Sequence, residues 1–585
     1  MRGVDSLPGT LCDLLASRAD TPDEQIAFTF LDNGEHDGAQ LSWGALVRRS
    51  HAVAAAIRQR TGPGSRVLLL FPPGLGVVPA LLGTFQAGAI AIPAYPPSAA
   101  RHDRTLLRLR GIVGDAGVEL IVSCASVASR QDWLATAIPE LRGLEWIVLE
   151  ETPDVPAPRI EAPSPDAVAL LQYTSGSTAV PRGVMVTHRN LMSNLAASAH
   201  LGQHDAASVS VSWLPVNHDM GLIQGILQPI FSGFSAWLMA PVAFLQRPAR
   251  WLEAMSRLGA THSGGPNFAF DLCVRRVATD AALDLRRWRV AFCGAEPIRP
   301  ATVEAFTHAF AGCGFRPEAL RPSYGLAEAT LLVTTTRAGE APRTLTVDGR
   351  ALSDGQVRLA ETHAPPATPR TIAGCGRPID GARLAVVDPL SRHRLEDGRV
   401  GEIWIAGDSV AAGYWRQPAA TAATFHARLE SDRHTAWLRT GDLGFIHDGE
   451  IFVTGRCKDT LIVRGLKHDP HDIELTVEAL GALRPGGVAV FALDTPPDRI
   501  VLIGEVDRGH PAPEASVIDG IRAAVAARHG IQLDAVLILA AGALPKTTSG
   551  KVQRYACRDA LRAGLFEPLA RWDGAVTPWP LEHSA

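Results

Sequence analysis

A stretch rich in serine, threonine and glycine, with one cation, lies between two short apolar segments. Its residues include Thr174, Ser175, Gly176, Ser177, Thr178, Arg182 and Gly183. Glycine lets backbone N–H groups approach an anion closely, hydroxyl groups add donors, and arginine supplies fixed positive charge. The stretch is therefore predicted to bind a polyphosphate. It is not a Walker A loop, in which the cation precedes Ser or Thr and a helix follows. A hairpin turn that binds nothing is the alternative.

A second motif combines an aromatic ring with a carboxylate. Ser323, Tyr324 and Gly325 are followed by Glu328. The ring could stack on a base, and the carboxylate could hold Mg²⁺, because Mg²⁺ in proteins needs only one or two carboxylates beside phosphate oxygens and water. A core ring and a solvated carboxylate are the alternatives.

Two later motifs each place one charged side chain beside glycine. Asp442 is predicted in a glycine-flanked turn, where its carboxylate could accept both hydroxyls of a ribose, although turn aspartates without a ligand are common. Lys551 follows Ser549 and Gly550 in a predicted loop and could reach an anionic centre. A solvated surface lysine is its alternative.

Bulk properties exclude several classes of protein. The 585 residues are enough for two or more domains, and 46% hydrophobic with 20% charged residues is ordinary for a globular protein. A net charge of −4 argues against nucleic acid or an anionic membrane surface as the main partner. The 8 cysteines are scattered without a CxxC pair, which indicates reduced thiols. Without a signal peptide pattern, a cytoplasmic protein is expected.

The elements that must position these motifs alternate between strands and helices, which predicts an α/β fold with largely parallel sheets. The uncharged run between Arg66 and Arg101 is interrupted by prolines, so it predicts a strand at 67–71, a helix at 76–87 and a strand at 89–93 rather than a membrane span. Thr187 is predicted to cap a helix that continues to about residue 200.

The pattern changes after Gly455. Helices at 472–483 and 515–529 and strands at 488–493, 500–506 and 535–539 predict a compact α+β unit. We therefore expect a large domain at 1–455, a hinge at 456–459 and a small lid domain at 460–585 that closes over a cleft. A long Pro-containing segment at 337–371 interrupts the large domain, and its pieces at 345–348 and 357–360 are predicted to pair as a hairpin.

These motifs, with Gly455-Arg456 and residues 544–551, resemble the adenylate-forming superfamily of acyl-CoA synthetases, peptide-synthetase adenylation domains and luciferases. The resemblance covers nearly the whole chain. Residues 212–222, 244–248, 263–268 and 291–297 are similar to the fatty acyl-AMP ligases in particular. Segment 337–371 stands where that family carries an insertion absent from ordinary CoA ligases.

The resemblance implies that a fatty or related carboxylic acid and ATP give an acyl adenylate and pyrophosphate. The acyl group would then pass to the phosphopantetheine thiol of an acyl carrier protein. Mg²⁺ is the expected metal, and a monomer or dimer is expected.

The resemblance also assigns roles. Lys551, Glu328 and His218 would be catalytic, and Glu328 with Thr174 would hold the metal. Tyr324 would stack on adenine, Asp442 and Arg456 would hold the ribose, and residues 174–183 would hold the β- and γ-phosphates. Lys458 or Asp459 would be the hinge. Other expected nucleotide contacts are Gly294, Ala295, Glu296, Ser323 and Gly325. Expected acyl contacts are Met220, Gly264, Gly265 and Phe268.

Two departures from the family pattern bear on these roles. Arg182 stands where lysine is usual, which keeps the charge but changes its shape. Residues 466–470 read Leu-Lys-His-Asp-Pro where Arg-Asn-His-Tyr-Pro is usual. An acyl-CoA synthetase is the nearest alternative function, and a non-catalytic binding protein on the same fold is a second.

Overall fold

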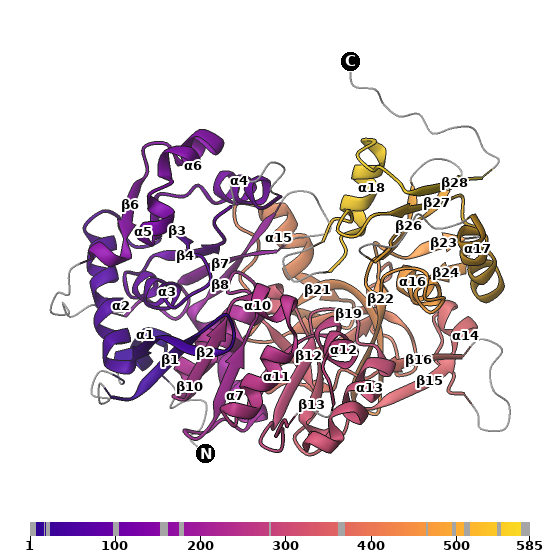
Figure 1. Ribbon diagram of the computed structural model, residues 1–585, viewed down its shortest axis with the longest axis horizontal. Coiled ribbons are helices and arrows are strands. Elements are labelled where there is room, and N and C mark those ends of the chain that lie inside the picture. The colour runs from indigo at the N-terminus through magenta and orange to yellow at the C-terminus, as the bar shows by residue number, and fades with distance from the viewer. Residues whose placement is uncertain are drawn as a thin grey trace.

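The computed structural model (Figure 1) describes residues 8–16, 18, 24–97, 104–152, 162–174, 181–279, 282–360, 369–463, 466–493, 499–507, 515–546 and 551–574. Two large sheets and a smaller one make up most of the chain, and a separate sheet at one side contains the C-terminal strands. The predicted α/β class and multi-sheet organisation are confirmed.

The first large sheet carries the motif around Thr174 at one edge. Its six strands run in the order β6-β5-β3-β4-β7-β8, parallel except for β8. Their bounds are β6 Glu145–Val148, β5 Leu120–Ser123, β3 Arg66–Leu70, β4 Ile90–Ala94, β7 Val168–Thr174 and β8 Arg182–Thr187. The uncharged run forms β3, the buried helix α3 (Val77–Gln86) and β4, as predicted. In the part of the chain that the structure describes, no helix is long and apolar enough to cross a membrane.

The second large sheet has nine strands in the order β17-β14-β13-β12-β11-β9-β10-β1-β2. Its six middle strands are parallel, so their carboxyl ends meet at one edge, where ligands bind in open α/β sheets. Their bounds are β13 Leu320–Gly325, β12 Val290–Gly294, β11 His262–Pro266, β9 Val209–Ser212, β10 Ser235–Met239 and β1 Ile26–Asp32. The outer strands are β17 Arg377–Pro378, β14 Leu332–Thr335 and β2 His36–Ser42.

Helices pack against these sheets and bury one large hydrophobic core. Thr187 caps α7 with a capping box, because its hydroxyl accepts from the Asn190 N–H while the Asn190 side chain accepts from the Thr187 N–H. The predicted cap is thus confirmed. The long helices are α2 Trp43–Arg58, α4 Arg104–Ala116, α7 His188–Gly202, α11 Ala249–Arg257, α12 Asn267–Arg276 and α13 Pro300–Phe310. The short ones are α1 Leu11–Ala16, α5 Ala125–Ala128, α6 Gln131–Ala137, α8 Asp219–Leu222, α9 Gln228–Ser232, α10 Pro241–Gln246 and α15 Pro418–Phe425.

A third sheet places Asp442 in a strand, so the predicted turn is wrong. Strands β18 (Arg383–Val387), β19 (Gly401–Ala406), β21 (Asp432–His447) and β20 (Ala427–Leu429) follow one another, and β22 (Glu450–Arg456) pairs with β21. Gly441 adopts φ +73° inside β21. Because glycine accepts this conformation, the long strand continues past it, and the glycines that suggested a turn mark an irregularity within a strand instead.

The C-terminal unit has its own sheet, β25-β26-β27-β28. Strands β25 (Val488–Leu493) and β27 (Ala535–Leu539) and helix α17 (Ala515–His529) have the predicted bounds, and β26 covers Arg499–Glu505. Helix α16 covers Pro470–Glu478 rather than 472–483. It begins earlier because the Asp469 carboxylate accepts from the His471 N–H at 3.0 Å and Pro470 suits the first turn. The remaining elements are β23 Leu461–Val463, β24 Leu466–His468, α18 Arg554–Arg562 and β28 Ala570–Asp573.

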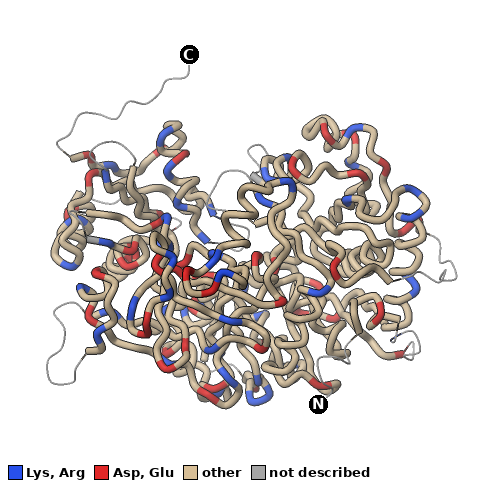
Figure 2. Tube along the Cα trace, turned by 180° about the vertical axis from the view of Figure 1, so that it is seen from behind, with Lys and Arg blue, Asp and Glu red and all other residues tan. Residues whose placement is uncertain are grey.

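In the 337–371 segment the predicted pairing of 345–348 with 357–360 is present in part, and a second, longer pairing was not predicted. Strand β15 (Thr344–Asp348) leads into α14 (Gly349–Ser353) and pairs along its length with β16 (Pro369–Ala373). The 357–360 piece touches β15 only through the Val347–Leu359 bridge and flanking backbone hydrogen bonds. The prediction chose the nearer partner, whereas β16 pairs more extensively. Residues 361–368 lie outside the described chain. Charges of both signs are interspersed over the chain (Figure 2).

Candidate active site

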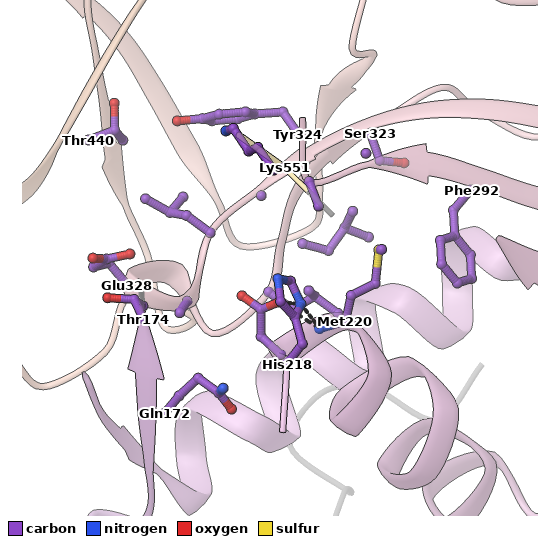
Figure 3. Close-up of a pocket in the computed structure, with 18 of the residues that line it drawn as sticks. Gln172, Thr174, His218, Met220, Phe292, Ser323, Tyr324, Glu328, Thr440 and Lys551 are labelled. Carbon is purple, nitrogen blue, oxygen red and sulfur yellow. Dashed lines mark hydrogen bonds and ion pairs between the residues drawn. The ribbon is translucent and has the colours of Figure 1, made fainter. Parts of the chain in front are cut away.

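A cavity of about 930 Å³ lies at the carboxyl ends of the parallel strands. Its wall also includes side chains from the C-terminal unit, among them Lys551 and Arg554. Figure 3 shows labelled side chains around it, with Glu328 and Thr174 toward one side and Met220 and Phe292 toward the other. The cavity thus brings together predicted residues that lie up to nearly 400 positions apart in the sequence.

The phosphate motif is described only at its two ends. Thr174 is the last residue of β7 and pairs in register with Arg182, the first residue of β8, and both line the cavity. Residues 175–180, which include Ser175, Gly176, Ser177 and Thr178, lie outside the described chain. A Cβ at Gly183 would stand 3.0 Å from the Tyr173 ring, so a larger residue would require the ring to move.

Glu328 is held by a tyrosine that stacks under the Arg182 guanidinium. The carboxylate is on a short 3₁₀ turn (Ala327–Ala329), and its Oε1 accepts from the Tyr414 hydroxyl at 2.9 Å. The Arg182 guanidinium lies 5.2 Å from the centre of the Tyr414 ring. Burial raises the pKa of Glu328 above its usual value. A cation bound near Glu328 would therefore favour its charged form.

Tyr324, Asp442 and Arg456 form a hydrogen-bonded group. The Tyr324 hydroxyl donates to Asp442 Oδ2 at 2.8 Å, and Arg456 Nε donates to Oδ1 of the same carboxylate at 2.8 Å. The pairing of β21 with β22 places Asp442 opposite Arg456. Tyr324 and Arg456 line the cavity, together with Ser323 and Gly325, while Asp442 lies behind them. The hydrogen bond anchors the hydroxyl end of the Tyr324 side chain.

Lys551 reaches the cavity from the loop before α18. Burial, with smaller contributions from Arg456 and Arg554, lowers the pKa of Lys551 to about 8 against the opposing effect of Glu296 and Asp442. Burial of a lysine favours its neutral form, so an anionic ligand is the partner that would hold it charged. Residues 547–550 of this loop lie outside the described chain.

His218 begins helix α8 and is paired with its neighbour. Its Nδ1 lies 2.7 Å from Asp219 Oδ1. Burial disfavours the imidazolium, but the Asp219 carboxylate outweighs burial and raises the pKa of His218 above its usual value. His218, Asp219 and Met220 all line the cavity. This arrangement places an imidazole ring, paired with a carboxylate, in the cavity wall.

Not every predicted residue faces the cavity. Gly264, Gly294 and Ala295 do, whereas Gly265, Phe268 and Glu296 are not among its lining residues. Glu296 Oε1 instead accepts from the Phe268 N–H at 2.6 Å. Gly264 is required by close approach, since a Cβ there would stand 2.2 Å from the carbonyl oxygen of Phe292. Gly265 packs closely against Trp213, because a Cβ at this position would stand 2.7 Å from the Trp213 ring.

The predicted hinge lies between β22 and β23. Lys458 and Asp459 both line the cavity, and Asp459 Oδ2 lies 3.2 Å from Arg554 Nη1. They stand two and three residues after Arg456. They therefore connect the Arg456 side of the cavity to the C-terminal unit.

Sequence reasoning missed Arg108 and Tyr414. Arg108 is on α4, lines the cavity, and donates through Nη2 to the Tyr173 carbonyl at 3.2 Å. Burial lowers its pKa, and its Nε has no hydrogen-bond partner among the described residues. Arg108 stands in an ordinary amphipathic helix, which gives no local signal. Tyr414 could have been noticed only as an aromatic residue in a Gly-Tyr-Trp run.

Comparisons with known proteins agree with this geometry. Residues 15–415 match the AMP-binding enzyme family, and residues 458–563 match the AMP domain of the disco-interacting protein 2-like family. The chain is 40% identical over 576 residues to a medium-chain-fatty-acid–[acyl-carrier-protein] ligase, JamA, of Moorena producens, covering 97% of each chain. It is 37% identical over 594 residues to a long-chain-fatty-acid–AMP ligase, FadD32, of Mycolicibacterium smegmatis, covering 92% of this chain and 93% of FadD32.

A solved structure is similar over the same extent. The fatty acyl-adenylate ligase of Legionella pneumophila, solved in complex with acyl adenylate and pyrophosphate, matches with a TM-score of 0.73 and 35% identity, covering 97% of this chain and 98% of that one. The chain therefore belongs to the AMP-binding enzyme family and, within it, to the fatty acyl-AMP ligases.

Proposed function

We propose that this protein joins a fatty or related carboxylic acid to AMP, with release of pyrophosphate, and passes the acyl group to a carrier-protein thiol. The observation that carries the proposal is the meeting of Lys551, Glu328 and the Gly264 wall in one cavity. One part of that cavity suits a nucleotide, and the other continues along the strands of the sheet, where we place the acyl channel.

The nucleotide would lie against Tyr324. Its hydroxyl is anchored by the bond to Asp442 and the residue lines the cavity, where its ring would stack on adenine. Asp442 and Arg456 would hold the ribose through the Asp442 lone pairs that Tyr324 and Arg456 leave open. Gly294 and Ala295, at the end of β12, would pass close to the base.

The phosphates would lie at the mouth formed by β7 and β8. Residues 174–183 would bind the β- and γ-phosphates, with Arg182 as the cation. Glu328 and the Thr174 hydroxyl fit Mg²⁺, because one carboxylate suffices when phosphate oxygens and water complete the octahedron. Bound Mg²⁺ would neutralise charge on the departing phosphates.

The reaction unites two anions, so cations must face them. A carboxylate oxygen attacks the α-phosphorus, the bond to the bridging oxygen breaks, and pyrophosphate leaves with that electron pair. Lys551 would bridge the attacking carboxylate and the α-phosphate, where charge accumulates. His218, held beside Asp219, would orient the carboxylate.

Two alternatives are distinguished by their acceptors. An acyl-CoA synthetase would use free coenzyme A, and a non-catalytic binding protein would form no adenylate at all. JamA carries the acyl-carrier-protein ligase activity in its name, and this relative favours a carrier protein. JamA and FadD32 are named for medium-chain and long-chain acids respectively. The two names differ, so the chain length of the acid accepted by this protein has to be inferred from its own cavity.

The test is to incubate the protein with ATP, Mg²⁺ and a panel of carboxylic acids, with coenzyme A or a phosphopantetheinylated carrier protein, and to resolve products by mass. We expect acyl adenylate and acyl carrier protein but little acyl-CoA. Lys551→Ala should nearly abolish adenylate formation while ATP affinity stays within a few-fold, because the lysine acts on developing charge. Lys467→Ala, on the exposed strand β24, is the matched control. Robust acyl-CoA synthesis by the intact protein would refute the proposal.

A further inference from the structure

The end of the cavity farthest from the nucleotide side is polar, although a fatty chain would be apolar. Its lining includes six polar side chains from α7, the loop after it, three strands and α9. They are Ser198, His204, Ser210, Gln228, His262 and Arg321. Polar side chains are seldom placed in a wall that meets only hydrocarbon, because burying them without partners is unfavourable.

The channel follows the face of four neighbouring parallel strands. Residues two apart on a strand point to the same face, and such pairs line the cavity on β9, β11, β12 and β13. The pairs are Ser210 with Ser212, His262 with Gly264, Val290 with Phe292, and Arg321 with Ser323. The second member of each pair is nearer the carboxyl ends, where the nucleotide side lies. Ser210, His262 and Val290 are in register with one another and form a deeper layer. Arg321 is in register with Phe292, and its side chain reaches the Leu201 carbonyl in α7, beside this layer.

Strand geometry gives the depth of that layer. Gly294, at the carboxyl end of β12, and Val290, in the deep layer, are four residues apart, which corresponds to about 13 Å of strand. An extended chain advances about 1.2 Å per single bond. An acid with its carboxylate near Gly294 therefore places a group about ten or eleven bonds away beside the polar layer.

Three packed rings and one charged side chain lie at the deep end of the channel. The rings of His204, Phe234 and His262 pack together, with centroid distances of 4.3 to 6.1 Å. Burial lowers the pKa of His262 to about 4 and that of His204 well below its usual value, so both are neutral at pH 7. Burial lowers the pKa of Arg321 to about 10, which leaves it charged, and it makes no ion pair within the described ranges.

Several polar atoms of this layer lack partners among the described residues. Gln228 Nε2 donates to the Leu195 carbonyl at 3.2 Å, and Arg321 Nη1 donates to the Leu201 carbonyl at 2.6 Å, so each side chain is anchored to α7. The unpartnered atoms are Ser198 Oγ, Ser210 Oγ, Gln228 Oε1 and Arg321 Nε. Buried polar atoms usually have partners, so these four indicate a missing polar group.

The unpartnered atoms include both hydrogen-bond donors and acceptors, which limits the chemical groups that the ligand could place there. Arg321 Nε–H can only donate, Gln228 Oε1 can only accept, and a serine hydroxyl can do either after a change of rotamer. A methyl end would bond to none of them. A carboxylate would accept from Arg321 but could not donate to Gln228. A hydroxyl group both donates and accepts, and so matches the whole set.

We propose that the acid activated here carries a hydroxyl group at or near its far end, about ten bonds from its carboxylate. The inference rests on the proposed function, since it assumes that the carboxylate end is adenylated. It goes further by naming the substrate class: a medium-length hydroxy acid rather than a plain fatty acid.

The test compares matched acids in the pyrophosphate-release assay with the full-length protein. Decanoate, 10-hydroxydecanoate and decanedioate differ only in the distal group, and six- and fourteen-carbon pairs test depth. We expect 10-hydroxydecanoate to have at least tenfold higher kcat/KM than decanoate, with a smaller preference at the other lengths. Equal or better use of decanoate, or best use of decanedioate, would overturn the inference and leave the proposed function standing. No adenylate from any acid would overturn both.

Variants locate the preference in the polar layer. Gln228→Leu and, independently, Ser210→Ala should each lower the ratio of hydroxydecanoate to decanoate turnover by at least threefold. Ser212→Ala, two residues along the same strand, should leave the ratio unaltered, because that hydroxyl already accepts from the Leu214 N–H. Thermal unfolding of each variant shows whether it folds. A ratio unchanged in both folded variants would place the preference elsewhere and overturn the assignment.

Discussion

Arg370 joins the 337–371 segment to the C-terminal unit. It is on β16, and its guanidinium lies 3.2 Å from Asp469 Oδ2 and 3.0 Å from Asp472 Oδ2, both beyond the proposed hinge. It also donates to the Thr454 carbonyl at 2.9 Å. This one side chain therefore ties the large part of the chain to α16 in an orientation that places Lys551 in the cavity. We predict that Arg370→Ala loosens that orientation.

The contact distances and exposure set the size of the effect. The Arg370, Asp469 and Asp472 side chains are 22%, 15% and 25% exposed, so solvent screens the pairs only partly. Two such pairs contribute about 1–2 kcal/mol after screening. This changes the population of one orientation roughly 5- to 30-fold. Arg299 still pairs with Glu478 at 2.8 Å in the variant, so the unit shifts rather than detaches.

The assay measures both half-reactions on one preparation. Adenylate is followed by pyrophosphate release, and acyl-CoA is followed by mass after coenzyme A is added. If the segment restrains the lid against use of free coenzyme A, the yield of acyl-CoA per adenylate rises roughly 5- to 30-fold in Arg370→Ala. The yield of acyl-CoA per adenylate in Arg370→Lys should lie between those of Arg370→Ala and the parent. Lysine keeps the charge, but it cannot contact both carboxylates as the guanidinium does.

Arg343 supplies the matched control. It belongs to the same segment and pairs with Asp448 at 3.0 Å and with Glu450 at 3.7 Å, but both partners precede the hinge. Arg343→Ala should therefore leave the product ratio at the parental value. The reasoning is refuted if both variants change the ratio equally, or if Arg370→Ala folds, forms adenylate and still makes no more acyl-CoA than the parent.

Three further predictions concern the nucleotide side. Glu328→Gln should raise the Mg²⁺ concentration for half-maximal adenylation about tenfold or more. Glu430→Gln, at a surface residue, should leave that concentration unchanged. An unchanged Mg²⁺ titration in Glu328→Gln would mean that Glu328 has only a structural role. Arg182→Lys should form pyrophosphate faster than Arg182→Ala, since either cation can face a phosphate; equal rates would make the charge dispensable. Because the protonated form of Lys551 is the active one and its pKa is about 8, kcat/KM for adenylation should fall above pH 8. A flat profile to pH 9.5 would contradict that role.

The sequence predicted local elements well where the signal is local. The strands at 488–493 and 535–539 and the helix at 515–529 are continuous apolar or periodic runs between clear breaks, and their bounds agree with the structure. The errors come from tertiary pairing. Asp442 was predicted in a turn because glycines flank it, but pairing with β19 and β22 keeps it in a strand. Segment 345–348 found its main partner in β16, more than twenty residues away.

The sequence predicted those residues of the candidate site that belong to recognisable motifs. Tyr324, Glu328, Arg456 and Lys551 lie in one cavity, and their joint presence there follows from sheet order, which no single motif contains. Arg108 shows the limit, since an arginine on an amphipathic helix looks the same in sequence whether it meets solvent or a ligand.

The acyl channel lies beyond that limit for a physical reason. Each of its deep positions is one residue of a short strand, and neighbours in the layer, such as Ser210 and Arg321, are more than a hundred residues apart in the chain. Within its own strand each looks like an isolated polar residue, and only strand order and register make them one surface. A strand pattern in the sequence predicts which residues are buried, and Ser210 and Arg321 are indeed buried. The neighbours of these buried side chains determine which carboxylic acid the channel accepts. Those neighbours are brought together by the pairing of β9, β11, β12 and β13, which no contiguous motif in the sequence specifies.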